Sequence, residues 1–324
     1  RLNKIIQALS QSGTFVADDI GMRFQDNRQE QSFNAYICQQ IARLKRLGKI
    51  RTSETYTAAF RSFNGFMNDK EVLFNQISAD LIAEYEAYLK GRGNSPNTIS
   101  FYMRVLKAVY NRAVEDGLTG QRHPFKSVYT GVEKTLKRAI SLNDLKRIKG
   151  LDLSLKPNLD FARDMFLFCF YTRGMSFIDM AYLRKKDLQN GILSYRRRKT
   201  GQQLFIKWER CMQEIVDKYP INETEYLLPI ITKRNKDYRK QYTNELHRVN
   251  HLLKKIGKQL DLSIPLTMYV GRHSWASIAK SRNVPISVIS EGMGHDSENT
   301  TQIYLASLDT SVVDRANKKI LDLL

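Results

Sequence analysis

The hydrophobic and polar positions of residues 1–121 follow the period of short amphipathic helices. Ser78 and Ser95 stand where helix caps are expected, and Pro96 suits a first helical position. The helix that opens at Pro96 ends at Gly117, and its inward positions are Ile99, Met103, Leu106, Tyr110 and Ala113. The first domain is therefore predicted to be a bundle of four or five helices, with a further apolar face at Tyr56, Phe60 and Phe63.

Periodicity is lost over residues 122–140, which contain Pro124 and Gly131. From Arg122 to Gly150 there are eight Lys or Arg residues against two acids. This composition predicts a flexible basic linker between two domains. Ser141 then caps a helix that opens the second domain, 141–324.

The second domain combines helical patterns with one hairpin. A strongly apolar helix is expected around residues 161–183. GILSYRRR and QQLFIKW alternate as strands, and Lys199-Thr200-Gly201 joins them. Residues 233–258 predict a basic helical surface, and a last helix after Tyr304 would carry the apolar stripe Val312, Val313, Ala316, Ile320 and Leu323. The predicted fold class is mainly α with a small antiparallel β-sheet.

Residues 267–305 bring several reactive side chain types together. The pattern predicts a helix around Arg272–Lys280 and a second helix from Pro285. Gly292 and Gly294 then break the periodicity and place His295 on a turn, and Tyr304 follows nine residues later, in a helix or a loop.

The composition indicates which class of molecule the chain binds. The 324 residues are 42% hydrophobic and suit two globular domains, and the net charge is +19 with a pI near 9.8. This surplus of positive charge predicts binding to a polyanion. Nucleic acid is the first candidate and a membrane surface the second, because no apolar run approaches the roughly 18 residues of a membrane-spanning helix. Cys38, Cys169 and Cys211 form no C-x-x-C pair, which favours a reducing cytoplasm over a disulfide framework or a cysteine zinc site.

A guanidinium binds phosphate oxygens, an imidazole moves a proton, and a phenol can attack phosphorus, which together suit a metal-free phosphoryl transfer. The motifs that carry these groups are Tyr269-Val270-Gly271-Arg272-His273, Met293-Gly294-His295 and Thr301-Gln302-Ile303-Tyr304. They resemble the C-terminal signature of the tyrosine recombinases, or phage integrase family, in which H-x-x-R-H and L-G-H precede the tyrosine.

This resemblance implies a helical core-binding domain, 1–121, followed by a recombinase catalytic domain. It implies that Tyr304 attacks a DNA phosphate to form a 3′-phosphotyrosine and that Lys199, on the hairpin, protonates the leaving 5′ hydroxyl. Arg272 and His295 would stabilise the transition state, and His273 remains for proton handling. Neither a metal nor a cofactor is expected.

Two positions depart from the family pattern. Ser176 stands where the family has its first catalytic arginine, with Asp179 on the carboxylate position. Arg173, about one helical turn earlier, is the favoured substitute, and Arg196, Arg197 or Arg198 are alternatives. Tyr269 replaces the histidine three residues before Arg272.

In the first domain, the resemblance suggests phosphate contacts at a helix N-terminus, from Lys90, Arg92, Asn94, Ser95, Asn97 and Thr98. A solvated polar turn is the alternative reading. Arg196 and Arg198 are added as DNA contacts in the second domain.

The expected function is site-specific recombination for integration or excision of a mobile element, or for DNA inversion. Its expected partners are duplex DNA with paired sites, further copies of the chain held through the C-terminal helix, and accessory DNA-bending proteins, in the bacterial cytoplasm and not at a membrane. Two alternatives stay open: an inactive DNA-binding paralogue and a type IB topoisomerase. An arm-binding domain before Arg1 also stays open.

Overall fold

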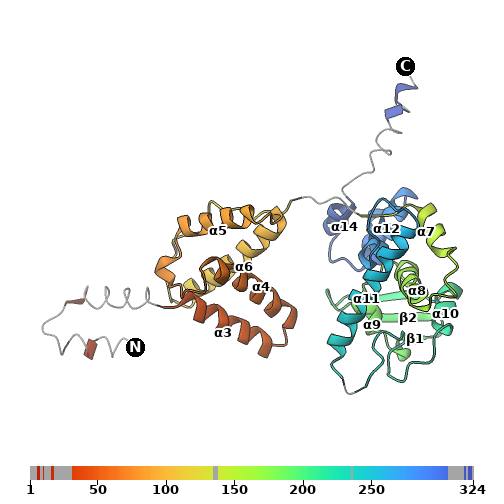
Figure 1. Ribbon diagram of the computed structural model, residues 1–324, viewed down its shortest axis with the longest axis horizontal. Helices are drawn as coiled ribbons and strands as arrows, with labels where there is room; N and C mark the ends of the chain where they lie inside the picture. The colour runs from red at the N-terminus through yellow and green to blue at the C-terminus, as the bar shows by residue number, and fades with distance from the viewer. Residues whose placement is uncertain are drawn as a thin grey trace. The chain divides into compact units, whose positions relative to one another are not determined.

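A computed structural model describes residues 6–7, 10, 16–17, 31–133, 138–234, 236–305, 317–318 and 320–322, with only the backbone of Ile303 and Tyr304. The chain divides into two compact units, Arg1–Thr135 and Leu136–Leu324 (Figure 1). Most of the predicted last helix, with Val312, Val313, Ala316 and Leu323, lies outside the described residues.

The first unit is a helical bundle. Ser78 and Ser95 accept hydrogen bonds from the backbone N–H groups of Leu81 and Thr98, so both predicted caps are confirmed. The elements are α3 (Phe33–Arg46), α4 (Ile50–Phe66), the 3-10 turn η1 (Phe74–Gln76), α5 (Ala79–Gly91) and α6 (Pro96–Glu115).

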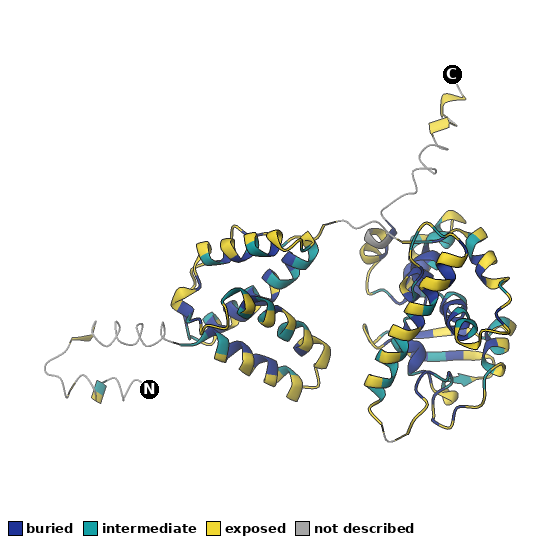
Figure 2. Cartoon of the chain, viewed as in Figure 1, coloured by how far each residue is buried: buried dark blue, intermediate teal, exposed yellow. Residues whose placement is uncertain are grey.

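The core of this unit lies along one face of α6 (Figure 2). All five positions predicted to face inward are buried: Ile99, Met103, Leu106, Tyr110 and Ala113. Around them pack aromatic rings from α3, α4, η1 and α5, including Phe33, Phe63, Phe74 and Tyr85.

The segment predicted to be a flexible linker, 122–140, begins as part of the first unit. Phe125 and Val128 are buried in its core. The Asn97 amide donates to the Glu133 carbonyl oxygen (3.0 Å) and accepts from the Glu133 N–H (2.9 Å). Residues up to Glu133 therefore belong to the first unit and not to the predicted linker, because buried apolar side chains and hydrogen bonds hold this irregular segment on the bundle.

The second unit surrounds a small antiparallel sheet with helices (Figure 1). The elements before the sheet are α7 (Leu142–Lys149), α8 (Pro157–Tyr171), α9 (Phe177–Ala181) and the 3-10 turn η2 (Lys185–Asp187). Those after it are α10 (Arg210–Asp217), α11 (Tyr238–Gln259), α12 (Met268–Ser281), α13 (Ile286–Met293) and α14 (Glu298–Leu305). Ser141 caps α7 as predicted, by accepting from the Asp144 N–H (3.0 Å).

The sheet has the order β1-β2-β3, with β1 (Leu188–Gln189), β2 (Ile192–Arg196) and β3 (Gln203–Lys207). The predicted hairpin is β2–β3, with Ser194 opposite Phe205. Leu193, Tyr195, Leu204 and Ile206 alternate onto the buried face. The predicted fold class, mainly α with a small antiparallel sheet, is confirmed, although β1 was not expected.

The apolar stretch 161–183 is two helices, not the single one predicted. α8 ends at Tyr171, and Arg173 (φ 59°) and Gly174 (φ 75°) turn the chain through left-handed conformations before α9. A Cβ on Gly174 would lie 2.9 Å from the Arg272 Cα, so this glycine allows α12 to approach closely. Arg173 therefore does not precede Ser176 by one turn of a continuous helix.

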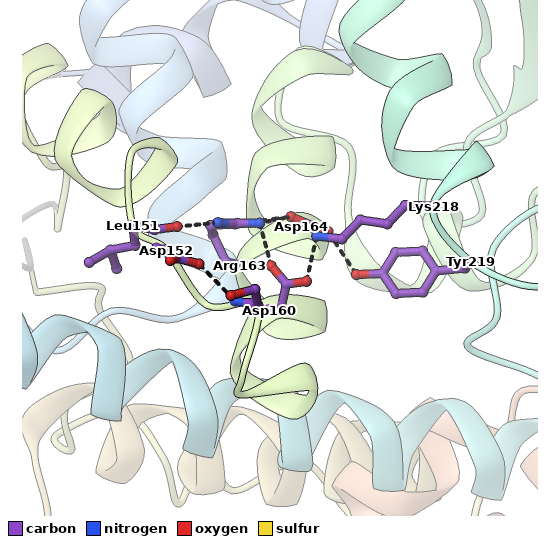
Figure 3. A network of polar contacts seen from close by, with 8 residues as sticks. Leu151, Asp152, Asp160, Arg163, Asp164, Lys218 and Tyr219 are labelled. Atoms are coloured by element: carbon purple, nitrogen blue, oxygen red, sulfur yellow. Dashed lines mark hydrogen bonds and ion pairs between the residues drawn. The ribbon is translucent and has the colours of Figure 1, made fainter.

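A polar network joins α8 to the residues that follow α10 (Figure 3). Asp164 accepts from the Arg163 Nε (3.0 Å), the Lys218 Nζ (2.8 Å) and the Tyr219 hydroxyl (2.7 Å). Asp160 also bonds to Arg163 and Lys218. Two carboxylates and two cations balance one another, so this network stabilises the unit internally.

Candidate active site

Arg272 is held where three segments meet. It lies on α12 and is 6% exposed. Its Nη1 donates to the Gly174 carbonyl oxygen (2.6 Å) and its Nη2 to the Met293 carbonyl oxygen (2.8 Å). The guanidinium is thus fixed between the break after α8 and the end of α13.

His295 follows a left-handed turn at Gly294 (φ 65°). Its Nε2 lies 3.0 Å from the Arg272 Nη2, and its Nδ1 lies 2.7 Å from the Thr301 Oγ1. Burial, followed by the charges of Arg272, Arg197 and Lys199, lowers the pKa of His295 to about 4. The imidazole is therefore neutral near pH 7.

The β2–β3 turn reaches this group of cations. Asp179 Oδ1 accepts from the Arg198 N–H (2.9 Å), and the Thr200 hydroxyl donates to the Gly294 carbonyl oxygen (3.4 Å). These bonds hold the turn that carries Lys199 beside the end of α13. The turn prediction from Lys199-Thr200-Gly201 is confirmed, with Gly201 at φ 75°.

Ser176 caps α9 and does not supply a cation. Its hydroxyl hydrogen-bonds to Asp179 Oδ2 (2.6 Å) and accepts from the Asp179 N–H (3.4 Å). These bonds fix the orientation of both side chains, and the other oxygen of Asp179 accepts from the Arg198 N–H in the hairpin turn. Asp179 is 3% exposed, so this carboxylate acts within the protein.

The three consecutive arginines of the hairpin have different environments. Arg196 donates to the Gly201 carbonyl oxygen (2.6 Å), and the Arg198 guanidinium lies 3.9 Å above the Tyr182 ring. Arg197 is 6% exposed and donates to the Gly294 carbonyl oxygen, while its buried Nε has no hydrogen-bond partner among the described residues. Burial and then the nearby charge of Arg272 lower the pKa of Arg197 and outweigh the opposing effects of Asp179, Tyr195 and Asp296, so its charge is only partly compensated.

Arg173 and Tyr269 lie in less enclosed positions. Arg173 is half-buried, and its side chain passes close to Gly292. Tyr269, in the first turn of α12, is 61% exposed, and its ring packs edge-on against buried His273 with centroids 4.2 Å apart.

Tyr304 lies in α14, which settles the choice between helix and loop in favour of the helix. Thr301 and Leu305, on either side of it in the sequence, are 0% and 4% exposed. α14 is thus packed against the unit at both residues.

The candidate phosphate contacts of the first unit mostly bond to the unit itself. Arg92 donates to the Tyr88 hydroxyl (2.9 Å), and Asn94 to the Leu89 carbonyl oxygen (3.1 Å). Ser95 and Thr98 form the cap of α6, with their hydroxyls 3.0 Å apart. Lys90 pairs with Glu86 (2.8 Å), and Asn97 holds Glu133.

A cavity of about 500 Å³ lies away from this cluster, among residues of η2 and of the loop before α11. Three of its four cations bond to neighbouring residues: Arg184 pairs with Glu225 (3.3 Å), Lys185 donates to the Asn222 carbonyl oxygen, and Arg234 donates to the Glu223 carbonyl oxygen. The cations that lie close together are instead those around Arg272 and His295.

Within the described residues, no group of three or more His, Cys, Asp or Glu side chains is arranged to hold a metal ion. In the same part of the chain, every helix is too short or too polar to cross a membrane.

Sequence comparison identifies two adjacent family matches. The Phage integrase SAM-like domain matches residues 32–130, and the Phage integrase family matches residues 155–311. Tyrosine recombinase XerA of Thermococcus kodakarensis is 25% identical over 233 residues, which are 70% of this chain and 77% of the relative. Tyrosine recombinase XerD of Listeria innocua is 21% identical over 270 residues, 78% of this chain and 86% of the relative.

Solved structures support the same fold. A lambda integrase dimer bound to a COC' core site aligns with a TM-score of 0.66 and 14% identity, over 94% of this chain and 85% of that one. The Tn1549 transposon integrase in complex with transposon right end DNA aligns with a TM-score of 0.62 and 15% identity, over 90% and 100% of the two chains.

Proposed function

Since the chain belongs to the tyrosine recombinase family, we propose that it cleaves and rejoins DNA at specific sites through a 3′-phosphotyrosine formed on Tyr304. The observation that carries this proposal is the convergence of Arg272, His295 and the Lys199 turn next to the helix that bears Tyr304. Like charges gathered in a half-buried place cost folding energy, and an arriving phosphate would compensate them.

Each group has a role that follows from its chemistry. Tyr304 attacks phosphorus, and Lys199 protonates the leaving 5′ hydroxyl. Arg272 and His295 stabilise the charge on the nonbridging oxygens. A second 5′ hydroxyl then reverses the step, and the energy of the broken bond stays in the phosphotyrosine link, so the exchange consumes no nucleotide.

We further propose that Arg197 replaces the family's first catalytic arginine. It is buried beside Arg272, its charge acts on His295, and its Nε retains an unused N–H. A phosphate oxygen is the acceptor that this donor would suit. Arg173 remains the competing candidate, at the break between α8 and α9.

Duplex DNA with paired sites is the proposed substrate, and several copies of the chain would assemble on it. The lambda integrase dimer and tetramer bound to DNA support this assembly by likeness of fold. Movement of a mobile element or inversion of a segment is the proposed biological role. Accessory DNA-bending proteins and an exchanged C-terminal helix belong to the same proposal, as does action inside the bacterial cell.

Covalent trapping tests the proposal. The protein and its Tyr304→Phe variant are incubated with nicked duplexes tiled across the DNA that flanks the gene for this chain. We expect a denaturant-resistant adduct from the parent protein and none from Tyr304→Phe. Tight binding without an adduct on any duplex would contradict the enzymatic function and favour an inactive DNA-binding paralogue. Relaxation of a supercoiled plasmid without the adduct-forming site would favour a type IB topoisomerase.

A further inference from the structure

The helix that carries Tyr304 is held on both sides of that residue. Three residues before it, Thr301 Oγ1 lies 2.7 Å from His295 Nδ1. One residue after it, the Leu305 carbonyl oxygen accepts from the Lys280 Nζ (2.9 Å), and the Leu305 side chain packs with Ala276 and Met293. These contacts seat α14 on α12 and α13 of the same chain.

The contacts of His295 define its tautomer. A guanidinium has donors and no acceptor, so the Arg272 Nη2 can only donate to His295 Nε2. In the neutral ring, the proton is then on Nδ1, which donates to the Thr301 hydroxyl oxygen. Thr301 therefore acts as an acceptor in the chain without DNA.

Binding of a phosphate changes which nitrogen of His295 must carry the proton. To hydrogen-bond a nonbridging oxygen, His295 Nε2 must carry a proton, either in the other neutral tautomer or in the imidazolium. In the other tautomer, Nδ1 becomes an acceptor and needs a donor. A threonine hydroxyl can rotate from acceptor to donor, so it can satisfy Nδ1 in both tautomers, and it accepts again from the imidazolium.

We propose that Thr301 is a positioning residue that couples the seating of α14 to the proton arrangement of His295. This inference rests on the proposed function, because it assigns His295 a phosphate to bind. When α14 is seated, Thr301 supplies the partner that lets Nε2 become a donor. When α14 leaves, His295 loses that partner and the phosphate site is incomplete. Seating of α14 therefore completes the phosphate site in the same step that brings Tyr304 to it.

The first test needs no DNA. Imidazole ¹⁵N and ¹H resonances are recorded for the parent protein, Thr301→Val and Thr301→Ser at pH 7. Valine matches the shape of this fully buried side chain, and serine restores the hydroxyl. We expect a protected Nδ1–H in the parent and in Thr301→Ser, and at least tenfold faster exchange of that proton in Thr301→Val. Equal exchange in all three would overturn the coupling.

The second test is a double-mutant cycle on adduct formation, using the duplex that traps the parent protein. We expect Thr301→Val to slow the reaction by about 10- to 100-fold, because Nδ1 becomes a buried acceptor without a donor when Nε2 binds the phosphate, and we expect Thr301→Ser to keep most of the parent rate. In a His295→Phe background, Thr301→Val should cause no further loss, because it acts through the imidazole. Lys280→Met serves as the matched control: it loosens the other end of α14, and its effect should multiply with that of His295→Phe.

The outcomes separate the two proposals. If the parent forms no adduct on any duplex, the proposed function fails, and the resonance experiment still decides whether Thr301 controls the His295 proton. If the rate losses caused by Thr301→Val and His295→Phe multiply, as those of Lys280→Met and His295→Phe should, then Thr301 only seats the helix and the coupling is refuted. If His295→Phe leaves no measurable adduct, the resonance experiment decides alone.

Discussion

The second unit contains two polar clusters that differ in their charge balance. Around Asp164, two carboxylates meet two cations and a tyrosine hydroxyl (Figure 3). Around His295, the charges of Arg272, Arg197 and Lys199 all lower the pKa of the imidazole, Asp179 and Asp296 offset only part of the charge of Arg197, and the Arg197 Nε has no hydrogen-bond partner among the described residues. Removing one member of the first cluster would leave a buried charge uncompensated, whereas the cations of the second cluster repel one another at a cost to folding that a bound anion can offset.

The largest expected effect concerns the balanced cluster. Asp164→Ala leaves Arg163 and Lys218 with one carboxylate instead of two, and should lower the free energy of unfolding by about 3 kcal/mol. Urea denaturation measures this change. The rate of adduct formation per folded molecule should stay at the parent value; a large loss of that rate would mean that this network also serves the reaction.

Arg197→Ala should have the opposite effects: a slower reaction and a nearly unchanged stability. We expect adduct formation to fall by about 10²- to 10³-fold, as for loss of one transition-state donor, while the urea midpoint stays within a small shift of the parent value. Arg196→Ala, at the exposed neighbouring position, is the matched control and should retain most of the rate. A greater loss in Arg173→Ala than in Arg197→Ala would assign the missing arginine to position 173.

The His295 cluster should also show itself in the dependence of stability on pH. The folded chain keeps the pKa of His295 near 4, below the ordinary 6.5, so the unfolded chain binds the proton first as pH falls. The contribution of this residue is present above about pH 6.5 and is lost as pH falls towards 4. Urea midpoints between pH 7.5 and 4.5 should decline less in His295→Gln than in the parent; parallel declines would contradict the lowered pKa.

The smallest effect extends the comparison to the first unit. Both ends of the Asn97 amide bond to Glu133, whereas Arg92 bonds to the Tyr88 hydroxyl and forms no ion pair within the described residues. For a 30-base-pair duplex, Asn97→Ala should leave the slope of log affinity against log salt unchanged, and Arg92→Ala should reduce its magnitude by about 1. Fluorescence anisotropy measures both slopes. A reduced slope in Asn97→Ala would return Asn97 to the phosphate contacts.

Local signals predicted the caps, the buried face of α6 and the hairpin well, because each depends on residues within a few positions of one another. The break after Tyr171 was missed, since its cause is the close approach of Arg272, which is 98 residues from Gly174. Only the glycine hinted at it. β1, with two residues, was too short for an alternating pattern.

The sequence named Arg272, His295 and Lys199 together as candidate site residues, but it did not indicate the different environments of the three hairpin arginines. Three consecutive arginines predict an exposed basic turn, but Arg197 continues the alternation of Leu193 and Tyr195 onto the buried face and packs against Gly294, whereas its two neighbours are exposed. Thr301 carried no distinguishing signal in the sequence. Its bond to His295 arises from the turn at Gly294, which brings the start of α14 back to the imidazole.

The anchoring of the connecting segment sets how the two units act on DNA. Glu133 is fastened to Asn97 and the Ile140 N–H to the Ser274 hydroxyl (3.0 Å), so only residues 134–139 separate the two anchor points. Seven residue steps span at most about 24 Å. Once one unit binds a duplex, the other is therefore retained at an effective concentration on the order of millimolar. Cutting either anchor lengthens the tether by a few residues and lowers this effective concentration only modestly, because it falls slowly with linker length.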